Sequence, residues 1–232
     1  MDNQLASLIA ANAAFVGSHF ALSHPLRAVL VRLLGDRGFL GLYSLVSFAA
    51  LWWIIQAFKA VGPSGVMLWN GQAVVPWVLA SLLTLVALAM VIGSLKGNPA
   101  LPDTPAARVA QARPTGMFAV TRHPMMWGFA LWAVAHIITS PSPRTLVTAG
   151  AMGVLALLGA HLQDRKKEAL LGETWRAWEA KTSYWPRWSR LGGTLGGSGA
   201  GVWLLALAAW LAASWAHIWL ANVPAGLWRW LG

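Results

Sequence analysis

Arginine and histidine stand side by side at the start of an apolar stretch, in the segment Arg122-His123-Pro124. Imidazole is a common ligand for metal ions and haem iron, and a guanidinium binds carboxylates or phosphates through paired hydrogen bonds. Three other histidines, His19, His24 and His161, lie near the ends of other apolar stretches. Histidines that meet at one depth from separate helices would supply the axial ligands of a haem or an open metal site.

The helical rise sets the expected depth of each histidine. His19 lies about 7 Å deeper in the first apolar stretch than His24, and an ionisable group inside such a stretch is a functional candidate. His136 lies about 20 Å from His123 along the same stretch, and His217 is similarly far along the last one. We therefore expect His136 and His217 to lie outside the site.

Asp164 follows His161 by about one helical turn, where a carboxylate can orient an imidazole. Each of these polar groups also has a structural explanation. Asp164 can neutralise the run Arg165-Lys166-Lys167, Arg122 can bind lipid headgroups, and His24 can be an ordinary polar helix end. With both possibilities open, the candidate cofactor-binding residues are His19, His24, Arg122, His123, His161 and Asp164.

The composition predicts the class of protein that must position these groups. Hydrophobic residues make up 57% of the 232 residues and charged residues only 10%, whereas soluble domains carry about a quarter charged residues. We predict an all-α integral membrane protein with six transmembrane helices, the fourth and fifth being short and forming a hairpin. The predicted spans are residues 5–22, 39–61, 73–95, 125–139, 146–162 and 202–221.

The basic residues predict the topology. Of the 17 Lys and Arg residues, 14 fall in the loops after the first, third and fifth spans. By the positive-inside rule these loops are cytoplasmic, so both termini are expected on the outer side of the membrane. Cations beside helix ends face the anionic headgroups of the bilayer, which explains the net charge of +10 without nucleic acid as a partner. The lack of cysteine excludes disulfides, thiolate-bound zinc, iron–sulfur clusters and cysteine-ligated haem.

Helical spacing over 164–181 predicts an amphipathic helix at the cytoplasmic membrane surface, with Gly172 as a point of kinking. A glycine-rich linker at 191–201 then leads to the last span. The expected organisation is a membrane domain over 1–190 with five transmembrane helices and the interfacial helix, the linker 191–201, and a sixth span with the C-terminus over 202–232.

Several motifs of this chain occur together in one known family. They are Gly17-Ser18-His19-Phe20, Ser23-His24-Pro25-Leu26-Arg27, Arg37-Gly38-Phe39 to Tyr43, Asn98-Pro99, Thr121-Arg122-His123-Pro124-Met125-Met126-Trp127-Gly128, and Ala160-His161 with Asp164-Arg165. Over about residues 11–186 the chain resembles the NnrU family of bacterial inner-membrane proteins, which implies that both termini lie in the periplasm. Members are associated with denitrification, through nitrite and nitric oxide reductase activity or expression. The family also resembles zeta-carotene isomerase, which uses histidine-ligated haem b, and this resemblance implies that His19 and His123 ligate haem iron.

A second resemblance is to the membrane methyltransferases that modify isoprenylcysteine or phospholipids. Arg122-His123-Pro124 before a hairpin, and Trp185-Pro186-Arg187 after a charged helix, are similar to segments of those enzymes. The resemblance implies binding of S-adenosylmethionine. This chain departs from the pattern at Met125-Met126, and Lys167-Glu168 replaces the expected pair of carboxylates.

Three hypotheses follow from the sequence. The first is an NnrU-like membrane protein with a haem or metal site near the cytoplasmic face, linked to nitric oxide metabolism or to isomerisation of a lipophilic small molecule. The second is an S-adenosylmethionine-dependent methyltransferase. The third is a non-enzymatic assembly or regulatory factor that binds denitrification proteins. Whether the protein is an enzyme is left open by the residues, and a haem-dependent isomerase is the form that catalysis would take.

Overall fold

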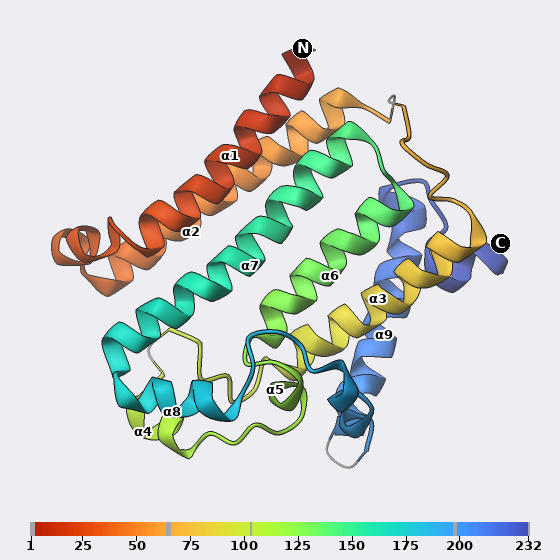
Figure 1. Ribbon diagram of the computed structural model, residues 1–232. Helices are drawn as coiled ribbons and strands as arrows, with labels where there is room; N and C mark the ends of the chain where they lie inside the picture. The colour runs from red at the N-terminus through yellow and green to blue at the C-terminus, as the bar shows by residue number, and fades with distance from the viewer. Residues whose placement is uncertain (1–2, 64–65, 103, 197–198, 232) are drawn as a thin grey trace.

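The computed structural model describes residues 3–63, 66–102, 104–196 and 199–231, and its regular elements are all helical (Figure 1). The long helices are α1 (Asn3–Ser23), α2 (Arg27–Val61), α3 (Val74–Gly93), α6 (Pro124–Thr139), α7 (Pro143–Leu171) and α9 (Gly199–Leu220). The shorter ones are α4 (Ala106–Gln111), α5 (Met117–Val120), α8 (Glu173–Lys181) and the 3-10 turns η1 (Trp188–Arg190), η2 (Gly192–Thr194) and η3 (Gly226–Trp230).

Five of these helices, α1, α2, α3, α7 and α9, are long and apolar enough to cross a membrane. The predicted fourth span is present as α6, but its 16 residues rise only about 24 Å, less than the roughly 30 Å of hydrocarbon in a bilayer. The structure thus confirms an all-helical chain with five candidate spanning helices, whereas the sequence predicted six.

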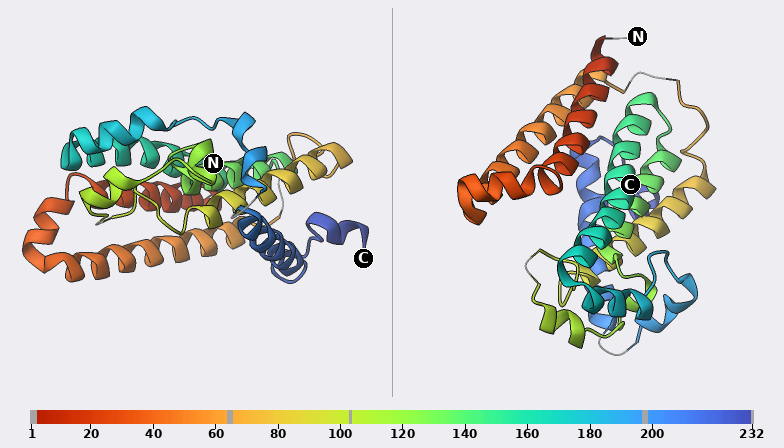
Figure 2. Two further views of the ribbon diagram at one scale, coloured as in Figure 1. Left: turned by 90° about the horizontal axis from the view of Figure 1, so that it is seen from below. Right: turned by 60° about the vertical axis from the view of Figure 1, so that its left-hand side comes forward.

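Helix α7 lies between the α1–α2 pair on one side and α6 on the other, and α3 and α9 follow beyond α6 (Figures 1 and 2). We call the end of the bundle that holds α4, α5 and α8 the basic end. The opposite end is called the aromatic end, and it holds the α6–α7 turn, the described part of the α2–α3 loop, and η3. The N-terminus and the C-terminus both point away from the basic end (Figure 1).

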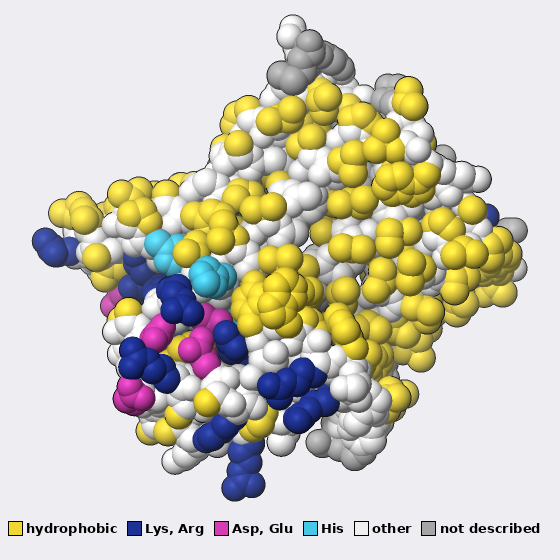
Figure 3. Space-filling view, viewed as in Figure 1, with side chains coloured by type: hydrophobic (Ala, Val, Ile, Leu, Met, Phe, Trp, Pro, Cys, Tyr) yellow, Lys and Arg dark blue, Asp and Glu magenta, His cyan; other side chains and the backbone are white. Residues whose placement is uncertain are grey.

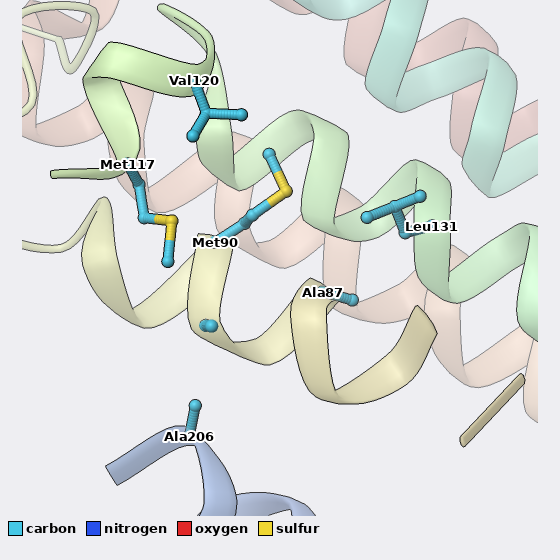
Figure 4. Close-up of a cluster of buried hydrophobic side chains, with 7 residues drawn as sticks. Ala87, Met90, Met117, Val120, Leu131 and Ala206 are labelled. Atoms are coloured by element: carbon cyan, nitrogen blue, oxygen red, sulfur yellow. The ribbon is translucent and has the colours of Figure 1, made fainter. Parts of the chain in front are cut away.

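Small residues let α3 and α6 pack closely. A Cβ atom at Gly128 would lie 2.7 Å from the carbonyl oxygen of Ala87 and 2.7 Å from a methyl group of Val91. Such close approach through glycine and alanine is typical of helices packed within a membrane. The buried cluster beside this contact joins α3, α5, α6 and α9 (Figure 4), and includes Ala87, Met90, Met117, Val120, Leu131 and Ala206.

Two glycines divide helices that the apolar pattern alone would continue. Gly35 has φ 71° and ψ 170°, so α2 bends before the predicted span at 39–61 begins. Gly172 has φ 53°, a backbone conformation that residues other than glycine rarely adopt, and it separates α7 from α8. The single helix predicted over 164–181 is therefore wrong as one element, because its first half continues α7.

The apolar side of α8 packs against protein. Trp175 and Trp178 are 0% and 2% exposed and contact Ala100, Val109 and Phe118 in a separate buried cluster. Helix α4, which supplies Val109 to this cluster, packs against the same side of α8. The two tryptophans therefore do not serve as a membrane-facing surface, contrary to what the sequence predicted for an interfacial helix.

The predicted linker 191–201 contains defined structure on both sides of residues 197–198, which lie outside the described residues. It includes η2, and its last residues already belong to α9. In η2, the Thr194 hydroxyl accepts a hydrogen bond of 2.9 Å from the Trp203 indole of α9. The glycine composition therefore gives short turns here that contact the following helix.

Candidate functional site

Arg122 and His123 converge on a single carboxylate, that of Asp164. The guanidinium donates to Asp164 Oδ2 from Nε at 2.9 Å and from Nη2 at 2.5 Å, and His123 Nε2 donates to Asp164 Oδ1 at 2.8 Å. The side chains of His123 and Asp164 are each 1% exposed. Charge-assisted hydrogen bonds offset the cost of removing these groups from water, and they hold the three side chains in fixed orientations.

Two elements bring these side chains together. Pro124 starts α6 with a fixed φ, so His123 is held as the N-cap residue directly before the helix. Asp164 lies on α7 about two turns before its C-terminus at Leu171. Because α6 and α7 are antiparallel neighbours, the start of the first meets the end of the second.

The segment that follows α8 is the third part of the chain that contributes to the site. The Arg122 amide donates to the carbonyl of Ser183 at 2.8 Å, and the Thr121 hydroxyl donates to the carbonyl of Tyr184 at 2.7 Å. The Trp127 indole also donates to the Tyr184 carbonyl, at 2.9 Å. These hydrogen bonds to the carbonyls of Ser183 and Tyr184 fix the main chain on both sides of Arg122.

Glu179 and Tyr184 complete the surroundings of the guanidinium. Glu179, on α8, lies 3.3 Å from Arg122 Nη2, and the Tyr184 ring centroid lies 5.7 Å from the guanidinium carbon. The Tyr184 hydroxyl donates to the carbonyl of Leu157 at 2.6 Å. Burial, with a further contribution from the charge of Asp164, raises the pKa of Tyr184. The phenol therefore stays protonated and serves as a donor.

A hollow of about 480 Å³ opens beside this network. Its lining consists of Arg122, Leu157, Leu158, His161, Tyr184 and Trp185. A second, apolar groove of about 390 Å³ runs between α6 and α7, and it shares two of these residues, Leu157 and Leu158. Small residues line much of the remaining groove, among them Ala130, Ala133, Ala149, Gly150 and Gly153.

Charge is distributed unevenly over the face that presents this hollow. Figure 3 shows acidic and basic side chains gathered toward the basic end and a mainly hydrophobic surface beyond it. Among the described residues, every Asp and Glu except Asp36 lies on α7 or α8. The site therefore stands at the boundary between a charged and an apolar surface.

The sequence model of one protein family, described as NnrU protein, matches residues 7–225. The chain belongs to the NnrU family. The match covers nearly the whole chain, including α9, and so extends beyond residues 11–186 on which the resemblance rested. No curated protein matches this NnrU-family chain, and no solved structure does.

In this NnrU-family protein, α7 separates the histidines of α1 from His123. On one face of α7, Lys166 donates to the Ser23 carbonyl of α1 at 3.5 Å. On the other face, Asp164 binds His123. Figure 1 shows α7 between α1 and α6 along their length. His19 and His24 therefore lie across α7 from His123.

The histidines of α1 have local partners. His19 Nδ1 donates to the Phe15 carbonyl at 2.7 Å, and its ring packs edge-on against Tyr43 at 5.3 Å between centroids. His24 is in the turn after α1, where burial foremost and then the charge of Lys166 lower its pKa. Neither residue takes part in the network around Asp164.

The arrangement does not fit haem held between His19 and His123. His123 Nε2 is occupied by Asp164 and its ring is almost completely buried, while His19 lies across α7. Over residues 3–63, 66–102, 104–196 and 199–231, no three His, Asp or Glu side chains form a group able to hold a metal ion.

Glu168 is also engaged within the protein. It accepts hydrogen bonds from Arg165 at 3.0 Å and from Arg176 at 2.9 Å. In the methyltransferases, a pair of carboxylates at this position helps to hold S-adenosylmethionine, but here two guanidinium groups already pair with Glu168. Sequence reasoning thus found Arg122, His123, His161 and Asp164, and it missed Thr121, Glu179 and Tyr184. The resemblance motif Thr121-Arg122-His123-Pro124 was the signal that could have included Thr121.

Proposed function

We propose that this NnrU-family membrane protein binds a lipophilic small molecule between α6 and α7. Its polar end would occupy the hollow beside Arg122 and His161, and its hydrocarbon part would occupy the adjoining groove. One observation carries the proposal, namely that hollow and groove share Leu157 and Leu158. An amphipathic ligand needs such a continuous path from polar to apolar lining.

Arg122 is prepared to bind oxygen atoms of a ligand. Asp164 and Glu179 engage Nε and Nη2, and Nη1 makes no hydrogen bond with any residue that the structure describes. His161 adds an exposed imidazole on the same lining. A guanidinium held in one orientation by carboxylates can donate to a hydroxyl, carbonyl or carboxylate oxygen without first being ordered.

The groove suits a long hydrocarbon group because its walls are made of small side chains. A Cβ atom added at Gly150 would have no other atom within 4 Å, so the groove is open at this point. In a bilayer, an opening between α6 and α7 at this depth faces lipid, which gives a lipophilic ligand direct access from the membrane.

This proposal places the protein in a bacterial inner membrane with its basic end in the cytoplasm and both termini in the periplasm, as the positive-inside rule predicts. The family resemblance supplies a biological setting in denitrification and nitric oxide metabolism. Within that setting the protein would act as a binding protein or an isomerase for its lipophilic ligand.

Displacement of a fluorescent long-chain polyene fatty acid from the purified protein tests the proposal. Gly150→Leu adds side-chain atoms at a point of the groove where an added Cβ meets no other atom, so we expect affinity to fall about tenfold or more. His161→Ala should weaken binding through the polar end. Gly41→Leu on α2, where added atoms also meet open space, is the matched control and should bind as the unchanged protein does. Equal affinity of Gly150→Leu and Gly41→Leu would contradict the proposal.

Haem b held by His19, without His123 as a ligand, is a second candidate, supported by the contact between His19 Nδ1 and the Phe15 carbonyl. A hydrogen bond at one ring nitrogen fixes the tautomer and leaves Nε2 as the coordinating atom, as is usual for histidine ligands. The visible spectrum of protein purified from haem-replete cells tests this. His19→Ala should abolish a haem absorption that His24→Ala retains, and a colourless unchanged protein would exclude haem.

A further inference from the structure

Two histidines that the site does not use lie close together at the aromatic end. His136 on α6 and His217 on α9 have ring centroids 6.3 Å apart, with an angle of 37° between the ring planes. They are 81 residues apart in the sequence and come from helices on opposite sides of α3. Their meeting is therefore a property of the fold, and the expectation that both lie far from the basic end is confirmed.

Both rings are held in the same way. His136 Nδ1 donates to the Trp132 carbonyl at 2.8 Å, and His217 Nδ1 donates to the Ala213 carbonyl at 2.7 Å. The proton is thus on Nδ1, and Nε2 carries a free electron pair on the ring edge farther from the backbone. Within the described chain, neither Nε2 atom has a hydrogen-bond partner. The Trp132 ring also stacks on His136 at 4.1 Å between centroids.

The separation of the rings matches two imidazoles that share one metal ion. A metal–nitrogen bond of about 2 Å, added to the ring radius, puts the metal about 3.2 Å from each centroid. Two rings on opposite sides of an ion are then about 6.4 Å apart, close to the observed value of 6.3 Å. Tetrahedral placement would bring the centroids about 1 Å closer together.

The surrounding charges favour a soft ion of low charge. Among the described residues no Asp or Glu lies at the aromatic end, so the carboxylate ligands that Mg²⁺ and Ca²⁺ require are absent from this part of the structure. His136 and His217 each occupy the last turn of their helix, and their carbonyls accept the capping hydrogen bonds from Ser140 and Ala221. Helix C-termini favour a positive charge.

From this geometry we propose that His136 and His217 bind one monovalent copper ion, Cu(I), through their Nε2 atoms. Imidazole is a good ligand for copper, and Cu(I) accepts two ligands in a nearly linear arrangement, whereas Zn²⁺ prefers four. The site lies one turn from the ends of both helices, where a metal ion can reach it from the aqueous side. It is independent of the hollow at Arg122.

The test is an anaerobic titration of the purified full-length chain with Cu(I), in competition with a coloured Cu(I) chelator. The unchanged protein should withdraw one equivalent of copper from the chelator. His136→Asn and His217→Asn should each lose that equivalent. His24→Asn is the control, because it removes a histidine at the basic end, and it should retain full binding.

A further variant separates loss of a ligand from loss of the fold. His217→Met supplies a thioether, which is a soft ligand for Cu(I) and a poor one for Zn²⁺ and Ni²⁺. His217→Met should therefore bind copper, whereas His217→Asn should not. The proposal is overturned if the unchanged protein withdraws no copper, if all histidine variants withdraw equal amounts, or if Zn²⁺ binds at this pair and Cu(I) does not.

Discussion

The two ends of the bundle hold their arginines by different chemistry. At the basic end, Arg122 is bound by the carboxylates of Asp164 and Glu179. At the aromatic end, Arg144 lies over the ring of Phe58, with 4.5 Å from the guanidinium carbon to the centroid. A carboxylate fixes the plane and direction of a guanidinium through hydrogen bonds, while a ring face supplies a broad attraction. Arg122 is therefore held in one direction toward a ligand, whereas Arg144 is not.

The largest expected effect comes from Asp164→Asn. This change leaves Arg122 charged and His123 buried without their shared anion, and breaking a buried pair of this kind costs about 3–5 kcal/mol. We expect a large drop in the free energy of unfolding, measured by thermal unfolding in detergent.

Glu173→Gln is the control for Asp164→Asn, because the Glu173 side chain is 85% exposed and pairs only with Arg176. Its unfolding midpoint should stay close to that of the unchanged protein. Similar midpoints for the two variants would show that the Asp164 network is no more important than a surface ion pair.

Gly71→Ala tests close packing at the aromatic end. An added Cβ would collide with the carbonyl oxygens of Thr139 and Ile138 at the end of α6. We expect a loss of about 1–3 kcal/mol in the free energy of unfolding, since backbone atoms have little room to move. Gly41→Ala, which meets open space, should leave stability unchanged. A tolerated Gly71→Ala would mean that the α2–α3 loop is not docked on α6.

Arg144→Gln removes a cation from the ring of Phe58. We expect the free energy of unfolding to fall by about 0.5–1 kcal/mol, which is typical of an exposed cation–π contact. Arg144→Lys keeps a cation at this position and should lose less stability. The unfolding midpoints of Arg144→Gln, Arg144→Lys and the unchanged protein would be measured in low and in high salt. A strong dependence on salt would indicate an ion pair where the structure shows a ring.

The smallest expected effect is that of Arg176→Gln at the basic end. Arg176 pairs with Glu168 and Glu173 on the surface, where solvent screens both interactions. The change should lower stability far less than Asp164→Asn does, and its effect should vanish in high salt. An effect as large as that of Asp164→Asn would contradict the difference between buried and exposed pairs.

The apolar pattern predicted the long helices well because a segment that must satisfy its backbone in lipid has few alternatives to a helix. Five of the predicted spans overlap α1, α2, α3, α7 and α9, and the short fourth span is α6. The prediction that the fifth span is also short was wrong, because α7 has 29 residues. The break at Gly172 agrees with the glycine that the sequence marked as a kink. The burial of Trp175 and Trp178 was missed, since the amphipathic pattern of α8 does not tell lipid from a covering protein segment.

The position of a residue along its helix follows from the sequence, but the direction that its side chain faces does not. His19 and His123 are near one end of the bundle, yet α7 lies between them. Which side of α7 a residue meets depends on the order of the helices in space, and a single sequence does not contain that order. The contact between His136 and His217 shows the same limit, because each was assigned a depth but no neighbour.

Photochemical crosslinking tests the ligand site most directly. A long-chain carboxylic acid with a photoreactive group in its tail would be irradiated with the purified protein, and the labelled peptides would be identified by mass spectrometry. We predict labelling of the groove residues on α6 and α7, such as Val134 and Val154, which an excess of unlabelled acid suppresses. Labelling spread equally over α2 and the other exposed helices, with no suppression by competitor, would contradict a ligand site between α6 and α7.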